Sequence, residues 1–217
     1  YGLKLRKFYV HGQTLNHQLE IQTGSADVLL WPGENPTRIY RIDSLLLGLS
    51  MHTDSILYKL RWGKQHEPAY SGLIGGYCSF ADYPNLNLEL NEGEFRIADS
   101  LYKFLPGNKL YIKPGGITEV HNFEIKGNSE RFRIEGTLGS DSTHTLSALL
   151  ENVNLEHLNF LLSPYNSQVT GKLSGEILVR NYRGKPFLES RITANGINFN
   201  GTPLGQVRMD NLYNALE

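Results

Sequence analysis

Short segments in which apolar and polar residues alternate recur along this sequence. The clearest examples are residues 56–62, 86–91, 131–135 and 206–210. A period of two places every second side chain on the same face of a pleated strand, so each segment has one apolar face and one polar face. The pattern predicts β-strands whose apolar faces must be covered by something.

Turn-forming residues separate these segments. Gly supplies positive φ and Pro a fixed φ, which tight chain reversals need. The spacing of the turns is typical of an antiparallel all-β fold, for which we expect about a dozen strands. The turn motifs are Pro32-Gly33, Tyr83-Pro84, Glu92-Gly93, Pro106-Gly107, Pro114-Gly115, Gly127-Asn128, Gly184-Lys185, Asn195-Gly196 and Asn200-Gly201.

One segment, residues 152–162, departs from the strand pattern. Four leucines between positions 155 and 162 have helical spacing, Asn152 or Asn154 can cap the N-terminus, and Pro164 follows the last leucine. We therefore predict one short helix at 152–162.

Composition excludes several classes of protein. The chain has 217 residues, of which 40% are hydrophobic and 20% charged, with a formal net charge of −1. These values fit one globular domain and give no field that would gather nucleic acid. The longest aliphatic cluster, residues 45–49, is interrupted by Gly48 and is far shorter than the roughly 20 residues that span a bilayer. We expect residues 1–217 to form one continuous unit, with a possible boundary between subrepeats at 163–167.

The sequence contains no recognisable catalytic or metal-binding motif. The seven histidines have no zinc-site spacing, and the single cysteine, Cys78, excludes an intrachain disulfide. The glycine-rich stretch 72–76 lacks the Lys-Ser/Thr of a phosphate loop, so a bulge or close backbone packing explains it better. We expect no enzyme activity, no metal and no cofactor.

The apolar residues at every second position of each strand define a candidate hydrophobic surface. If two sheets close on each other, these residues are core; if one sheet only curls, they line an open groove. The pattern alone does not decide, although closed sandwiches are the commoner solution. The candidate groove residues are Ile56, Tyr58, Leu60, Trp62, Leu86, Leu88, Leu90, Phe132, Ile134, Ile177, Val179, Ile192, Val207 and Met209.

From His52 onward the chain resembles the C-terminal part of the TamB family, in its Bacteroidetes form, and more broadly the AsmA-like bridge proteins. Each motif alone is weak, and the resemblance depends on their order. The segments that carry it are the strand ending in Trp62-Gly63, the LELNEGEFRIADSLYKF block at 88–104, the KLYIKPGG stretch within 109–141, the LENVNLEHLNFLL segment at 150–162, VTGKLSGEILV at 169–179 and ANGINFNGTPLG within 194–211.

The resemblance implies a β-taco, a U-shaped, half-barrel-like sheet with an apolar concave face. It implies a segment of a periplasmic bridge in a Gram-negative bacterium, anchored in the inner membrane and reaching the outer membrane. The implied partners are phospholipid acyl chains or unfolded outer-membrane protein strands, with a BamA-type barrel (TamA-like) at the outer membrane. The implied roles are phospholipid transport and outer-membrane protein assembly.

The alternative function is a closed β-sandwich that serves as an interaction or adhesion module. A glycan-binding module should expose Trp and Tyr beside polar groups. The two tryptophans are Trp31 and Trp62, and Trp62 shares the apolar parity of its strand, which favours the groove. A segment cut from a longer ribbon should also expose unpaired strand edges, which we expect near residues 3–8 and 207–212.

Overall fold

A computed structural model describes residues 2–15, 18–31, 40–42, 44–64, 67–97, 100–139, 141, 143–162, 165–180 and 186–214. Within these residues the chain forms seventeen strands and three helical turns of three or four residues. The strands are β1 (Gly2–Arg6), β2 (Tyr9–Leu15), β3 (Gln18–Ser25), β4 (Asp27–Trp31), β5 (Tyr40–Ile42), β6 (Leu45–Met51), β7 (Ser55–Lys64), β8 (Glu67–Ser79), β9 (Leu86–Ile97), β10 (Ser100–Phe104), β11 (Asn108–Lys113), β12 (Ile117–Lys126), β13 (Arg131–Leu138), β14 (Thr145–Asn154), β15 (Val169–Arg180), β16 (Phe187–Phe199) and β17 (Thr202–Asn214).

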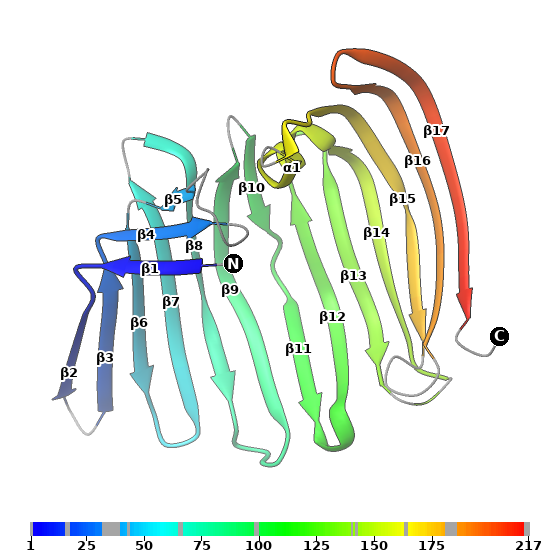
Figure 1. Ribbon diagram of the computed structural model, residues 1–217. Helices are drawn as coiled ribbons and strands as arrows, with labels where there is room; N and C mark the ends of the chain where they lie inside the picture. Colours follow the sequence, from blue (N-terminus) through cyan, green and yellow to red (C-terminus); the bar gives the residue numbers. More distant parts are fainter. Residues whose placement is uncertain are drawn as a thin grey trace.

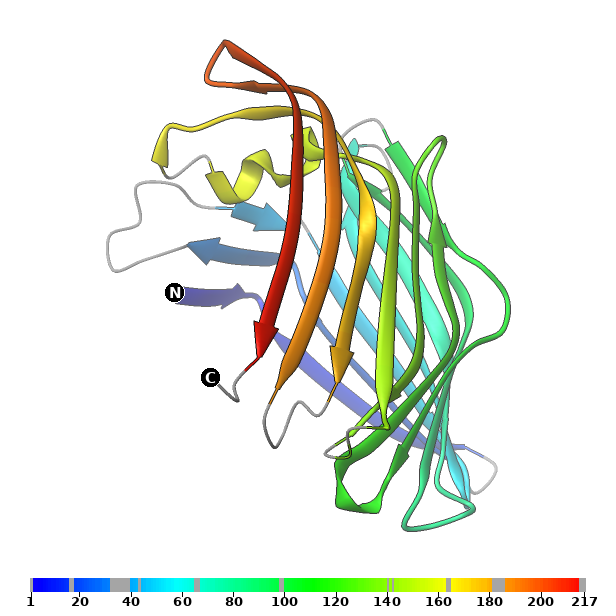
Figure 2. The same cartoon turned by 90° about the vertical axis from the view of Figure 1, so that its right-hand side faces the viewer.

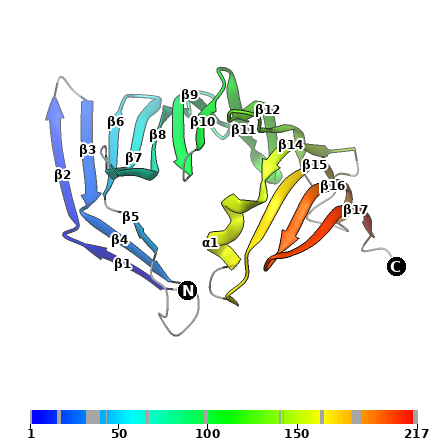
Figure 3. The same ribbon diagram turned by 90° about the horizontal axis from the view of Figure 1, so that it is seen from above.

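Fourteen of these strands form one antiparallel sheet (Figure 1). Its order runs from β17 down to β12, then through β10, β9, β8, β7, β6 and β3 to β2, with β11 paired to both β9 and β12. The sheet arches over without joining its two edges, β2 and β17 (Figure 3). The prediction of an all-β, curled and open sheet is confirmed.

The first hairpin bends and gives rise to a second, smaller sheet. Lys7 adopts a positive φ of 52° between β1 and β2. On the other arm, the buried Ser25 hydroxyl lies 2.7 Å from the Arg6 carbonyl oxygen and 2.8 Å from that of Asp27. The pair β2–β3 belongs to the large sheet, whereas the pair β1–β4, which continues the same hairpin, leaves it. Strands β1, β4 and β5 cross the concave side of the large sheet (Figures 1 and 3).

The predicted helix is shorter than expected. Strand β14 continues to Asn154, whose side chain accepts a hydrogen bond from the Glu156 N–H at 3.0 Å and caps the turn. The helical segment is a 3₁₀ turn, η2 (Leu155–Leu158), followed by α1 (Asn159–Leu162). Asn152 is not the cap: it has a φ of 51° beside a register shift in β14.

Two predicted turns are wrong. Glu92-Gly93 lies inside β9 and Asn195-Gly196 inside β16, and both coincide with register shifts. The motifs at 32–33 and 184–185 lie outside the described residues, as do Ser163 and Pro164 of the predicted boundary. The large sheet continues across that boundary, because β15 pairs with β14.

Asn108, at the start of β11, is the one fully buried polar side chain among the described residues. Its amide donates to the carbonyl of Leu105, the residue that follows β10, and accepts the N–H of Glu124 in β12 at 2.6 Å. Asn108 therefore links the turn before β11 to β12. Replacing Asn108 by Ala leaves both groups unsatisfied and should cost about 2–4 kcal/mol of unfolding free energy. Urea denaturation measures this, and a loss below about 0.5 kcal/mol would contradict the role we give Asn108.

Candidate hydrophobic groove

The pairing registers place all fourteen predicted groove residues on the same face of the large sheet. Direct cross-strand partners share a face, so the face can be followed from strand to strand. Leu60, for example, is opposite Leu47 of β6 and Ile74 of β8. The same face carries Ile56, Tyr58, Leu60 and Trp62 of β7, Leu86, Leu88 and Leu90 of β9, Phe132 and Ile134 of β13, Ile177 and Val179 of β15, Ile192 of β16, and Val207 and Met209 of β17.

This face is the concave one. The segment η2–α1 lies inside the curve of the sheet (Figures 2 and 3). Its Leu155 is buried against Ala194 and Ile197, with Leu173 packed beside them. Leu173 pairs with Ala194, which pairs with Val207, so the helical segment rests on the face that carries the predicted residues.

An aromatic cluster that the sequence analysis did not select lies on the same face. Phe95 stacks on Tyr102 at 5.1 Å between ring centroids, and Phe104 lies 5.8 Å from both Phe95 and Phe123. These rings come from β9, β10 and β12. The alternation within residues 95–104 was the signal that could have identified them.

On this face, aromatic rings lie over strand glycines and fill the space where a glycine side chain is missing. A Cβ added to Gly72 would collide with the Trp62 ring, and one added to Gly93 would collide with the Phe104 ring. Gly76 lies beneath the Tyr58 hydroxyl. Rings that lie over strand glycines stabilise a sheet and fix its register, and here they occupy the space above Gly72 and Gly93.

The concave face is only partly covered. Among the described residues, eight hydrophobic side chains are buried, including Leu90 and Val120. Apolar side chains of the concave face nearer the edges are between 36% and 63% exposed, such as Val10, Leu19 and Met209. The chain exposes 13657 Å², whereas a compact monomer of this mass exposes roughly 10,000 Å². The apolar face is therefore an open groove rather than a closed core.

A buried polar cluster ties the helical segment to the sheet. The Tyr102 hydroxyl donates to the Glu130 carboxylate and lies 2.6 Å from Nδ1 of His157. Glu130 also accepts the Asn154 N–H at 2.8 Å. Burial, together with the Glu130 carboxylate, raises the pKa of the Tyr102 phenol, so this hydroxyl stays protonated and available as the donor.

The convex face is polar. Its cross-strand neighbours include the ion pairs Lys59–Glu92 at 2.8 Å and Lys109–Glu89 at 3.2 Å. Arg131 binds Glu124 through two nitrogens, Nε at 2.7 Å and Nη2 at 3.0 Å. The sheet is thus amphipathic as a whole, with an apolar inner face and a hydrated outer face.

The comparisons add no relative. No protein-family model, curated protein or solved structure matches the chain. Within the described residues, no three His, Cys, Asp or Glu side chains gather as a metal site would require. The same residues include no helix of the length and hydropathy that crossing a membrane takes.

Proposed function

We propose that the concave face is a passive hydrophobic groove that holds the acyl chains of phospholipids. In this proposal the chain is a segment of a TamB-like bridge in the periplasm of a Gram-negative bacterium. The full-length protein would be anchored in the inner membrane, and it would pass lipid toward the outer membrane and support protein insertion there with a BamA-type barrel partner.

One observation supports the groove above all: a continuous apolar face that the fold leaves open. Soluble monomers rarely expose contiguous apolar patches of more than a few hundred Å² unless a ligand or partner covers them. Here apolar side chains of β2, β3, β11, β16 and β17 on this face are exposed. The ligand that such a surface suits is long, apolar and variable in length, as an acyl chain is.

The alternative, a sandwich module that closes its apolar face inside itself, has less support. The small sheet β1–β4–β5 and the segment η2–α1 lie over limited parts of the concave side (Figure 3). Among the described residues, no second layer is comparable in size to the fourteen-stranded sheet. An unfolded outer-membrane strand, with its own apolar face, remains the second candidate occupant of the groove.

Native mass spectrometry tests this proposal. Residues 1–217, exported to the periplasm of a Gram-negative host and purified without detergent, should carry one or more phospholipids. The matched competitor is a synthetic peptide of alternating apolar and polar residues, which should displace lipid if strands also use the groove. A protein that arrives free of lipid and takes up none from vesicles would refute the lipid proposal.

A further inference from the structure

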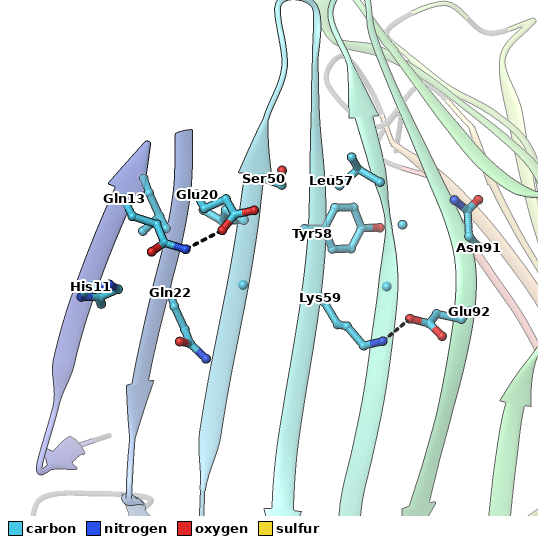
Figure 4. Close-up of a pocket in the computed structure, with 15 residues that line it drawn as sticks. His11, Gln13, Glu20, Gln22, Ser50, Leu57, Tyr58, Lys59, Asn91 and Glu92 are labelled. Atoms are coloured by element: carbon cyan, nitrogen blue, oxygen red, sulfur yellow. Dashed lines mark hydrogen bonds and ion pairs between the residues drawn. The ribbon is translucent and has the colours of Figure 1, made fainter. Parts of the chain in front are cut away.

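The convex face contains a depression that the hydrophobic groove does not use. It has a volume of about 640 Å³ and lies over Gly48 of β6 and Gly75 of β8 (Figure 4). An added Cβ at Gly48 would find its nearest heavy atom, the Lys59 carbonyl oxygen, at 3.9 Å. Glycine inside a strand often marks the close approach of a ligand. On the concave face rings cover Gly72 and Gly93, whereas the space above Gly48 is empty.

The side chains around this depression form a mixed set of hydrogen-bond donors and acceptors. Gln13 Nε2 donates to Glu20 Oε2 at 2.8 Å, and Lys59 is paired with Glu92. Within the described part of the chain, four polar lining residues have side chains that make no hydrogen bond or ion pair. These four are His11, Gln22, Ser50 and Asn91. The depression therefore offers free amide and imidazole groups beside carboxylates whose charge is already compensated or hydrogen-bonded.

A second, smaller depression continues the first along the same face. Leu57 at the edge of the first is the direct cross-strand partner of Tyr77, which lines the second, of about 140 Å³. The Tyr77 hydroxyl donates to Glu89 at 2.8 Å, and Tyr111 lies on the far side of Asn87. Together the two depressions, which we call the convex trough, cross β2 to β11, a span of about 30 Å at the usual strand spacing.

We propose that the convex trough binds a linear, uncharged polysaccharide that lies across the strands. Each sugar hydroxyl both donates and accepts, which matches free amides next to carboxylates. The C–H face of a sugar ring can pack on the tyrosine rings, whose π faces carry partial negative charge. The trough thus has the tyrosines beside polar groups that a glycan site needs.

Other polymers fit the convex trough less well. Glu20 is hydrogen-bonded to the neutral Gln13 amide, so its charge still repels phosphates, and both lysines of the trough are already paired with carboxylates. Nucleic acids and anionic lipid surfaces need unpaired positive charge. This inference uses the opposite face from the hydrophobic groove and holds or fails independently of the lipid proposal.

Titration of residues 1–217 with cellohexaose, chitohexaose and maltohexaose, followed by NMR and calorimetry, tests the proposal. At least one hexasaccharide should bind saturably and shift resonances of β2 to β11. Gly48→Leu projects a side chain into the depression from a position where an added Cβ has its nearest heavy atom at 3.9 Å, and Tyr77→Ala removes a packing surface. Each should weaken binding by about tenfold or more. Thr193→Leu on the convex face of β16 is the matched control and should bind as the unaltered chain does.

Two results would overturn the proposal: no binding of any of the three sugars at millimolar concentration, or undiminished binding by a folded Gly48→Leu protein. If either trough variant fails to fold, as judged by its thermal melt, Tyr111→Ala replaces it with the same expected loss. Ile134→Arg, which places a charge in the concave groove, should leave sugar binding unchanged and so separates this proposal from the lipid proposal.

Discussion

Ile134→Arg is expected to abolish lipid retention by residues 1–217 while lowering the unfolding free energy by less than about 1.5 kcal/mol. Ile134 lies on the concave face of β13, between its partners Phe123 and Ala148, and is only half-buried. In an open groove, the arginine stem can lie along apolar neighbours while the guanidinium reaches water. The charge would then interrupt the apolar path without unfolding the sheet.

The same substitution discriminates between an open groove and a closed core. In a closed core it would bury an unpaired charge, at a cost of several kcal/mol. Thr137→Arg is the matched control, because it adds the same side chain to the convex face of the same strand. Thermal melting and native mass spectrometry give the two readouts, and outer-membrane integrity in cells with the full-length variant gives a third. Gross unfolding by Ile134→Arg alone would contradict the open groove.

The period-two pattern was sufficient to predict the fold class and the face of every selected groove residue. Parity works because a slip of one residue would turn a whole strand's apolar set outward. Whether the sheet closes depends instead on which strands occupy its edges. That arrangement is set by contacts between distant strands, and neither β2 nor β17 carries a local signal of being an edge.

The two wrong turn predictions fall inside long strands, β9 and β16. Glycine serves a tight turn and a β-bulge through the same lack of a Cβ, so Glu92-Gly93 and Asn195-Gly196 are ambiguous in sequence. Pairing of Glu92 and Gly93 with β8, and of Asn195 with β15, keeps β9 and β16 continuous through these motifs. The start of the helical segment was ambiguous for a similar reason. Asn152 and Asn154 are equally good N-cap residues in the sequence, and only the extent of β14, which runs through Asn152 and ends at Asn154, leaves Asn154 as the cap.

The convex trough was not predictable from one sequence. Gly48 is unremarkable within its leucine-rich strand, and the hollow appears only when Gln22 and Lys59 are its cross-strand neighbours. The aromatic cluster likewise forms from three strands. Such features need the register of the whole sheet, whereas parity needs one strand alone.

The edge strand β17 should mediate self-association of residues 1–217. It pairs with β16 along one side, and no described strand pairs with its other side. Of the two edges expected from sequence, the one at 207–212 lies in this strand, and the one at 3–8 overlaps β1, an outer strand of the small sheet. The other edge of the large sheet is β2. A long edge with exposed Val207, Met209 and Leu212 readily pairs with another strand.

One antiparallel register of two β17 strands stands out. With Met209 opposite Met209, Arg208 of each copy faces Asp210 of the other on the convex side, so opposite charges meet twice. On the concave side Gly205 faces Tyr213, the same ring-beside-glycine pairing that Trp62 and Gly72 make within the sheet. Because direct cross-strand partners share a face, this register places the apolar faces of the two copies on the same side of the joined sheet. The hydrophobic grooves of the two copies would then be continuous.

Met209→Lys should therefore convert the chain to a monomer. It places two like charges directly opposite each other at the centre of the pairing, which destabilises a strand pair, while a 44% exposed side chain leaves the fold of each copy intact. Thr137→Lys, on an interior strand, adds the same charge away from the edge and should not change the association. Sedimentation equilibrium measures the effect, and an unaltered chain that stays monomeric at high concentration would exclude β17 as a pairing edge.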